Sequence, residues 1–269
     1  RLGQKQQKRE TRMPHISFSE LKNWNFCPFY HKLVNIEKIA AFKGNEYTAF
    51  GTAIHDVCEK QVTKEDKTAV EHFLKRFEEE LQDLDSDVDI RDDLVASMRE
   101  QGAVLAPEAV PMLSEIFGPY EVISAEEQLY EPIEGIENYT FKGFIDLVIQ
   151  TADGKFHIID WKTCSWGWNQ RRKADPMTTY QLTLYKHFFA KKHNIEEDLI
   201  ETHFALLKRT AKKDRVEIFR VTSGDKKTKN ALNLLHKALH NIQKGTCVKN
   251  RLSCTSGYGC DLYKTEHCP

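Results

Sequence analysis

The sequence lacks any apolar run near the roughly 20 residues that a membrane-spanning helix needs. No secretory signal, internal repeat, low-complexity tract or coiled-coil heptad is visible either. These absences exclude the integral membrane and fibrous classes. Since 269 residues with 40% hydrophobic content can bury a sizeable core, we expect a globular protein inside the cell.

An excess of charge of one sign is also missing, because 39 basic and 40 acidic residues give a net charge of −1. This net charge does not by itself indicate nucleic-acid binding. The basic residues are nevertheless clustered, at 5–12, 171–173, 208–215 and 226–229. Each cluster alone fits a solvated loop or helix end as well as it fits a phosphate contact.

Hydrophobic spacing predicts a helical first part and a second part rich in strands. Ser17 and Glu20 have capping-box spacing and begin a helix that runs to Phe26. Other helices are expected at 48–62, 68–84, 90–98, 177–192 and 226–244, with a looser, proline-punctuated helical region up to 119. Strands are expected at 120–131, 138–150, 155–163, 201–209 and 215–222.

This order predicts one α/β domain with a central mixed β-sheet flanked by helices. We divide it into a basic N-terminal tail (1–16), a helical part (17–119), a core (120–222) and a helix with a Cys-rich tail (223–269).

Two acids and a lysine lie on neighbouring predicted strands. Asp160 and Lys162 share a face because they are two residues apart. A three-residue loop at 152–154, with Gly154 left-handed, places Asp146 opposite Asp160, with about 5 Å between the Cβ atoms. A two-residue turn would point Asp146 to the other face.

Paired carboxylates repel each other unless a cation lies between them, and oxygen ligands suit Mg²⁺ or Mn²⁺. The pattern therefore predicts a divalent-metal site, with Lys162 orienting or deprotonating a water. A structural ion pair between Asp146 and Lys162 is the alternative.

Four sequence elements, in order, resemble the RecB-like branch of the PD-(D/E)xK nucleases. Its G-x-x-D and D-x-K elements are matched by Gly143-Phe144-Ile145-Asp146 and by Asp160-Trp161-Lys162. Gln181 and Tyr185 match Q-x-x-x-Y, and Gly51-Thr52-Ala53-Ile54-His55 matches the upstream histidine. The resemblance covers about residues 17–268 and implies a restriction-endonuclease-like core.

The resemblance also implies roles that the residue types alone do not fix. As metal ligands it implies His55, Asp146, Asp160 and the backbone carbonyl of Trp161, with Glu127 as a further candidate. As catalytic residues it implies Asp146, Asp160, Lys162, Gln181 and Tyr185. For His55, Gln181 and Tyr185, ordinary packing is the alternative.

Aromatic and basic residues beyond the D-x-K strand are candidates for nucleic-acid binding. They are Trp166, Trp168, Arg171, Arg172, Lys208 and Arg209. A tryptophan stacked on an unpaired base contributes on the order of 1–3 kcal/mol. The two tryptophans would otherwise cap the edge of the sheet.

Seven cysteines without secretory features do not predict a disulfide framework. The resemblance extends to relatives with an iron–sulfur cluster, such as AddB-type and CRISPR-associated members. It implies a [4Fe–4S] cluster on Cys27, Cys254, Cys260 and Cys268, which would join the two ends of the chain. Cys247 is a substitute ligand, and a four-thiolate Zn²⁺ site is the rival.

The resemblance implies a metal-dependent DNA nuclease. We expect a cytoplasmic exonuclease of bacterial, archaeal or phage origin that acts on single-stranded or end-containing DNA. Recombination, repair, phage replication and spacer acquisition are the expected settings, with a recombination or helicase partner and no membrane contact. The alternatives are a catalytically silent scaffold that binds nucleic acid, and an endonuclease on the same core.

Overall fold

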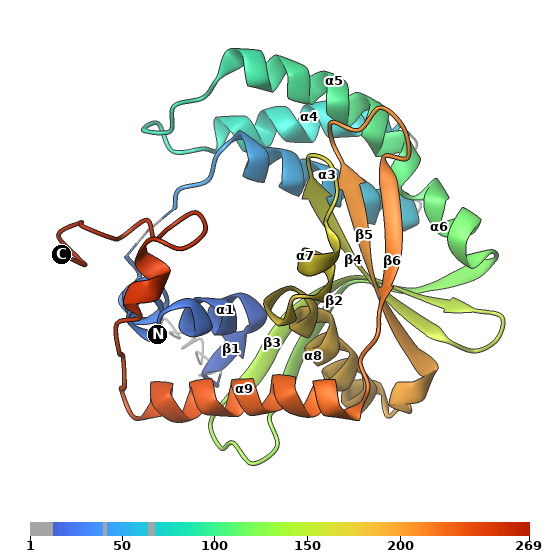
Figure 1. Ribbon diagram of the computed structural model, residues 1–269. Coiled ribbons are helices and arrows are strands. Elements are labelled where there is room, and N and C mark those ends of the chain that lie inside the picture. Colours follow the sequence, from blue (N-terminus) through green and yellow to red (C-terminus); the bar gives the residue numbers. More distant parts are fainter. Residues whose placement is uncertain (1–12, 40–41, 64–67) are drawn as a thin grey trace, which may run out of the picture.

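The computed structural model describes residues 13–39, 42–63 and 68–269. Within these ranges the chain forms a six-stranded mixed sheet with helices on both faces (Figure 1). The strand order is β1-β3-β4-β5-β6, and β2 also pairs with β3. The predicted α/β class with a mixed central sheet is therefore confirmed. None of the helices in the described ranges is both long and apolar enough to cross a membrane.

The elements follow the predicted order closely. The strands are β1 (His15–Ser17), β2 (Tyr120–Pro132), β3 (Thr140–Thr151), β4 (Phe156–Cys164), β5 (Ile200–Lys208) and β6 (Val216–Val221). The α-helices are α1 (Phe18–Phe26), α2 (Pro28–His31), α3 (Glu46–Val62), α4 (Ala69–Gln82), α5 (Asp92–Ala109), α6 (Pro111–Phe117), α7 (Gln170–Ala174), α8 (Pro176–His193) and α9 (Asp225–Gln243). Short helical turns are η1 (Lys32–Ile36), η2 (Glu197–Leu199) and η3 (Arg251–Cys254).

Local sequence explains where several helices begin. The Ser17 hydroxyl accepts a hydrogen bond from the backbone N–H of Glu20 at 3.2 Å, which caps α1 as predicted. Asn45 and Thr48 form a reciprocal capping box at the start of α3. Proline occupies the first turn of α8, where a missing N–H costs nothing.

The helical region before the sheet is more regular than expected. One helix, α5, continues through Pro107 to Ala109. Leu105, Ala106 and Ala109 are fully buried, and their packing holds the helix together although Pro107 removes one backbone hydrogen bond. The sequence analysis also missed β1 and α7, which are too short to show a hydrophobic period.

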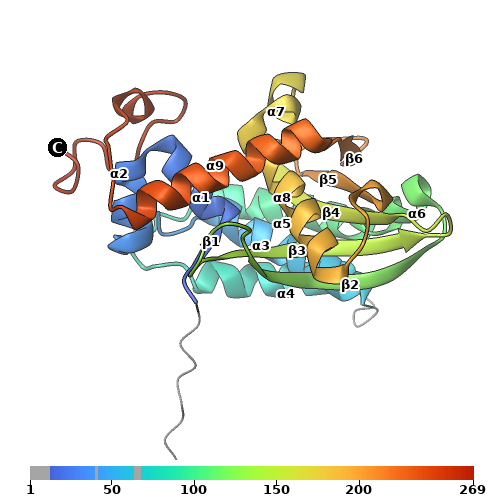
Figure 2. The same ribbon diagram turned by 90° about the horizontal axis from the view of Figure 1, so that it is seen from below.

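Helices cover the two faces of the sheet with two separate clusters of buried side chains. One face packs against α3, α4 and α5, through residues such as Phe50, Phe73 and Trp161. The opposite face packs against α1, α8 and α9, as Figures 1 and 2 show. Both clusters pack against the same sheet, and the division of the chain as a single domain stays a prediction.

One edge of β3 changes its partner along its length. Residues 140–142 pair with β1, which is parallel, whereas residues 147–150 pair with β4, which is antiparallel. Between them, Gly143 to Ile145 pair only with β2, on the other edge, and Asp146 is in none of the three pairings. The described sheet therefore has a gap beside the G-x-x-D element.

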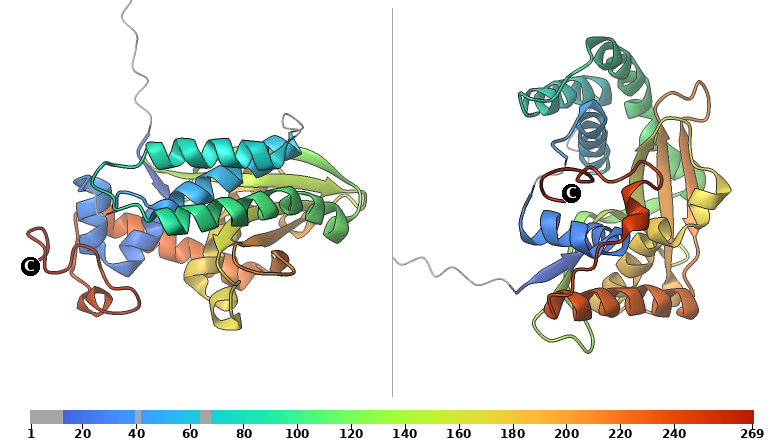
Figure 3. Two further views of the ribbon diagram at one scale, coloured as in Figure 1. Left: turned by 90° about the horizontal axis from the view of Figure 1, so that it is seen from above. Right: turned by 60° about the vertical axis from the view of Figure 1, so that its left-hand side comes forward.

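The two ends of the described chain meet beside α1 and α2 (Figure 3). Ser253 Oγ and Asn250 Nδ2 both donate hydrogen bonds to the carbonyl of Phe26, at 2.5 and 2.9 Å. The Lys249 ammonium lies 4.6 Å from the centre of the Phe29 ring. The C-terminal segment is thus held against the first helices by protein contacts.

Candidate active site

The gap in the sheet brings Asp146 beside β4. The predicted three-residue loop is confirmed: Thr151 N donates to Lys155 O, and Gly154 has a φ of 83°. The last paired residues are Leu147 and Ile159, so Asp146 and Asp160 are next in register. Asp146 Oδ2 accepts a hydrogen bond from the Trp161 backbone N–H at 2.8 Å, where a strand partner would otherwise lie.

Asp160 is a buried carboxylate whose oxygens are poorly satisfied. Its side chain is 1% exposed, and Lys162 Nζ lies 2.6 Å from its Oδ2. The ammonium of Lys162 thus partners Oδ2, whereas within the described ranges Oδ1 has no hydrogen-bond partner. Since a buried charge needs compensation, Oδ1 is available to a cation. Lys162 forms its ion pair with Asp160. The alternative considered from the sequence was a structural ion pair between Lys162 and Asp146.

His55 reaches the same place from α3. Its Nδ1 lies 3.8 Å from Asp146 Oδ2. Burial, followed by repulsion from Lys162, lowers the pKa of His55 to about 4. The imidazole is therefore neutral near pH 7 and offers a lone pair, as a metal ligand must. The backbone of Trp161 hydrogen bonds to His55, so the Trp161 backbone belongs to this site too.

The charges of the site are strongly coupled. Burial and then repulsion from Asp160 raise the pKa of Asp146 well above its ordinary value. Burial alone would lower the pKa of Lys162, but attraction by Asp160 and Asp146 outweighs burial and raises it. Two acids that repel each other in a buried place are the arrangement that a divalent cation stabilises.

Glu127 does not lie at this site. Burial would raise its pKa, but hydrogen bonds from Lys192, Ser124 and His193 lower it to about 2. Lys192 Nζ and His193 Nε2 lie 2.5 and 2.8 Å from Glu127 Oε1. This ion-paired carboxylate ties β2 to α8, so Glu127 is withdrawn as a candidate metal ligand.

The acidic side chain of β2 that faces the site is its neighbour Glu126. Burial, repulsion from Glu59 and repulsion from Asp160 all raise the pKa of Glu126. Glu126 has a left-handed φ of 51°, which reverses the expected alternation of side chains along β2. Of the neighbours Glu126 and Glu127 the resemblance favoured Glu127, because the sequence does not reveal this irregularity; sequence reasoning did not consider Glu59, on α3.

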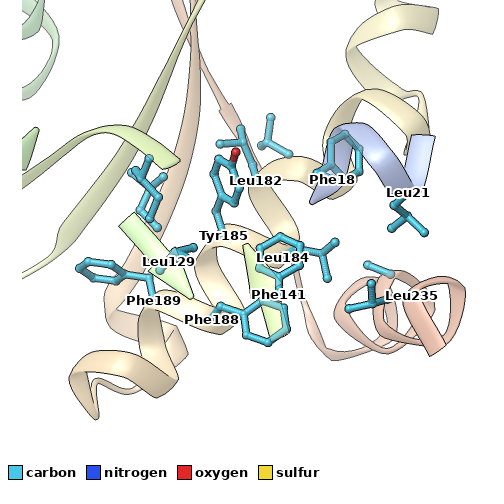
Figure 4. Packing of buried hydrophobic residues seen from close by; sticks show 14 of the residues in the cluster. Phe18, Leu21, Leu129, Phe141, Leu182, Leu184, Tyr185, Phe188, Phe189 and Leu235 are labelled. Atoms are coloured by element: carbon cyan, nitrogen blue, oxygen red, sulfur yellow. The ribbon is translucent and has the colours of Figure 1, made fainter. Parts of the chain in front are cut away.

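Gln181 and Tyr185 line the opposite side of the gap, on α8. Gln181 Nε2 donates to Tyr185 Oη at 3.1 Å. The Tyr185 hydroxyl points away from the stacked rings of Phe141 and Phe188 (Figure 4). Burial, then repulsion from Asp160, raise the pKa of Tyr185 to about 12. A Cβ at Gly143 would lie 2.7 Å from Tyr185 Cε1, so glycine is needed there.

Three of the residues expected to contact nucleic acid are engaged inside the protein. Trp168 is 9% exposed and packs on Phe204 and Phe219. Arg209 is buried and donates a hydrogen bond to Gln101, and Lys208 Nζ pairs with Glu217 at 3.6 Å. These contacts give Trp168, Arg209 and Lys208 partners within the protein, so the structure adds no support to them as nucleic-acid contacts.

The remaining candidates are accessible. Trp166 is 75% exposed. Arg171 and Arg172 are exposed on α7, and the Arg172 guanidinium lies 4.4 Å from the Trp168 ring centre. Basic residues 5–12 lie outside the described residues.

Four cysteines line one cavity of about 220 Å³ between the ends of the chain: Cys27, Cys254, Cys260 and Cys268. Cys247 is not among the lining residues. The backbone N–H of Asn250 donates to Cys27 Sγ at 3.3 Å. In the described ranges no three cysteine sulfurs lie within 4.8 Å of one another, so the thiols are not drawn together as around one Zn²⁺, which holds them about 3.8 Å apart.

Comparisons with known proteins identify a family and similar solved structures. A family model described as "PD-(D/E)XK nuclease superfamily" matches residues 15–268. A crystal structure of a candidate exonuclease from Eubacterium rectale is 12% identical, with a TM-score of 0.59 over 94% of this chain and 91% of that one. SSO0001 is 14% identical, with a TM-score of 0.42 over 94% and 85%. LHK-Exo in complex with dAMP is 11% identical, with a TM-score of 0.31 over 74% and 94%. No curated protein matches the chain.

Proposed function

Because the chain belongs to the PD-(D/E)XK nuclease superfamily, we propose that it hydrolyses DNA phosphodiester bonds with a divalent cation. One observation carries this proposal. Asp146 and the Asp160 oxygen that lacks a partner in the described part of the chain meet Lys162, which is 33% exposed, in a gap of the sheet.

The donor set of the gap fits Mg²⁺ or Mn²⁺. His55, Asp146, Asp160 and the Trp161 carbonyl would hold the cation, with Glu126 replacing Glu127 at the solvent side. Carboxylate and carbonyl oxygens suit Mg²⁺, and one imidazole also suits Mn²⁺. When bound, such a cation polarises the phosphate and lowers the pKa of a bound water.

Lys162 and the α8 pair have roles that follow from their protonation. The raised pKa keeps Lys162 a cation in the metal-free protein, so its Nζ donates to a phosphate oxygen or holds the attacking water. Deprotonation of that water by Lys162 requires that its ion pair with Asp160 first be broken. The Tyr185 hydroxyl stays protonated, with a pKa of about 12, and positions the substrate together with Gln181.

The proposed substrate is single-stranded or end-containing DNA. We further propose that the protein is an exonuclease of the RecB-like branch. Exposed aromatic side chains support this. Trp166 follows the catalytic strand, and Phe144 is 43% exposed within the gap itself; both can stack on unpaired bases. Repulsion from Lys162, after burial, lowers the pKa of Lys22, which puts a further cation on the α1 side of the site.

We also propose that Cys27, Cys254, Cys260 and Cys268 hold a [4Fe–4S] cluster. They line one cavity, and a backbone N–H donates to the Cys27 sulfur, an interaction that tunes iron–sulfur centres. Anaerobically purified protein should be coloured. Colourless protein that carries one equivalent of zinc and no iron would replace the cluster with the zinc site.

A nuclease assay with labelled strands tests the main proposal. Linear single-stranded DNA with a fluorophore at either end is incubated with Mg²⁺, Mn²⁺ or EDTA, beside a circular single strand. The proposal predicts metal-dependent loss of the linear strands, with the circle resistant. Cleavage of the circle would assign an endonuclease, and binding without turnover in any metal would assign a silent scaffold.

A further inference from the structure

We propose that His157, Glu201 and His203 form a second metal site, separate from the active site, that takes Zn²⁺. The three side chains lie on one face of two neighbouring strands. His157 on β4 pairs in register with Glu201 on β5, and His203 follows Glu201 by two residues. One ligand atom from each lies within 4.8 Å of the other two.

The distances between the ligand atoms suit one small cation. His157 Nδ1 and His203 Nε2 are 3.1 Å apart, and Glu201 Oε2 lies 3.9 and 4.0 Å from them. Tetrahedral Zn²⁺, with bonds of about 2.0–2.1 Å, separates its ligand atoms by about 3.3–3.4 Å. Two imidazoles and one carboxylate are a zinc ligand set, and water completes the fourth position.

A hydrogen-bond chain sets the tautomer of His157. The Thr151 hydroxyl donates to Asp153 Oδ1 at 2.5 Å. Because its proton is used there, Thr151 Oγ1 accepts the hydrogen bond from His157 Nε2–H at 3.0 Å. The Nδ1 lone pair of His157 is then directed toward His203. Metal-binding histidines use outer partners of this kind to fix the ligating nitrogen. In the metal-free protein, His203 Nε2–H donates to that lone pair.

The carboxylate of Glu201 is divided between two tasks. Its Oε1 pairs with Lys155 Nζ at 3.0 Å and with Arg220 at 3.3 Å. Its Oε2 faces the two imidazoles and, among the residues that the structure describes, pairs with no lysine or arginine. Lys155 and Arg220 therefore orient the carboxylate and leave one oxygen for a metal, although their charges reduce its affinity for a cation.

Both imidazoles are buried. His157 and His203 are each 6% exposed. The Phe117 ring, at the end of α6, lies 4.7 Å from the His157 ring and 5.0 Å from the His203 ring. Burial lowers the pKa of both histidines, so both are neutral near pH 7 and able to ligate.

A cation here would clamp β4 to β5 without entering the reaction. His157 lies three residues before Asp160 on β4, which is about 10 Å along the strand. The ligand atoms of the proposed zinc site are mainly nitrogen, whereas those of the active site are mainly oxygen. The proposed zinc therefore stabilises the strand that carries Asp160 and Lys162.

Crystals of the full chain grown with ZnCl₂ test the proposal directly. Data collected on both sides of the zinc absorption edge should show an anomalous peak between His157 Nδ1 and His203 Nε2. Anomalous peaks only at the active site or at the cysteines would overturn the proposal.

A zinc titration in solution provides the second test, in an Asp160→Asn background that weakens the active site. Thr151→Val removes the partner of His157 and should lower zinc affinity about 10- to 100-fold. His203→Gln should remove one zinc equivalent. The matched control is His187→Gln, which breaks another His–Glu pair, with Glu197 at 2.8 Å, and should leave binding unchanged. Equal zinc content and affinity in all four proteins would overturn the proposal, and Thr151→Val decides the matter if His203→Gln fails to fold.

Discussion

At the residue scale, the site depends on placing charges where water cannot compensate them. Within the described residues one oxygen of Asp160 has no hydrogen-bond partner, while the pKa of Asp146 is raised and that of His55 is lowered. Perturbed groups of this kind cluster at functional sites. Their common neighbour is Lys162, whose positive charge compensates the two acids.

Removing either charge of the Asp160–Lys162 pair should stop cleavage without unfolding the protein. Asp160→Asn removes a proposed metal ligand, and Lys162→Ala removes the group proposed to hold the water. We expect cleavage of single-stranded DNA to fall by about 100-fold or more in each variant, as measured with the end-labelled strands. Lys75→Ala is the control, because Lys75 is largely exposed on α4. Wild-type rates in either active-site variant would exclude this mechanism.

Asp146→Asn should stabilise the metal-free protein. The pKa of Asp146 is raised above its ordinary 3.8 by folding, so metal-free wild type loses stability as the pH rises through that interval. Asparagine keeps an oxygen for the Trp161 N–H but carries no charge. In EDTA at pH 7, the variant should therefore melt at a higher temperature than wild type.

Manganese should reverse the order of the two proteins. It should raise the melting temperature of wild type while leaving Asp146→Asn nearly unchanged, because binding to the folded state stabilises it. If the variant melts at a lower temperature than wild type in EDTA, the charge of Asp146 does not destabilise the metal-free protein.

At the scale of elements, the site is a break in a regular sheet. β3 pairs with β1 and then with β4, and residues 143–146 lie between these two pairings. The loop 152–154 sets the register that brings the two acids together. A strongly periodic sequence predicted the long helices and strands, the hairpin loop and the face shared by Asp160 and Lys162.

The sequence failed where one backbone angle or a distant contact decides the outcome. The resemblance favoured Glu127, yet Glu127 pairs with Lys192, and its left-handed neighbour Glu126 faces the acids. Trp168 and Arg209 are residue types that often bind nucleic acid. In this protein, however, Trp168 packs on Phe204 and Arg209 hydrogen bonds to Gln101, and both side chains are buried. Such contacts join residues that are far apart in the chain, so the local sequence pattern does not predict them.

Gly143→Ala should disturb the contact between β3 and α8. Its Cβ would lie 2.7 Å from Tyr185 Cε1, so the ring must move away from the gap. Overpacking of this kind costs about 1–3 kcal/mol, and we also expect a loss of cleavage because Tyr185 faces the acids. Gly224→Ala is the matched control, since its Cβ meets nothing within 4 Å. Chemical denaturation compares the two, and equal stability would contradict the close packing.

At the scale of the whole molecule, the two ends of the chain meet at the cysteine cavity. Asn250 and Cys27 are in contact although they are 223 residues apart in sequence. A link between such distant residues removes much freedom from the unfolded chain. The proposed cluster would therefore reinforce a junction that hydrogen bonds to Phe26 already form.

Cys27→Ser should loosen this junction. The variant should lose iron and visible colour, and limited proteolysis should release the segment after α9 faster than in wild type. Cys164→Ser is the control, because Cys164 does not line the cavity. Unchanged iron content in Cys27→Ser would contradict the proposed ligand set.

The most direct test of the whole account is to locate manganese in crystals of the full chain. Our account predicts an anomalous peak bounded by His55, Asp146, Asp160 and the Trp161 carbonyl, and its loss in Asp160→Asn crystals. Manganese-soaked wild-type crystals without a peak between the two carboxylates would contradict it.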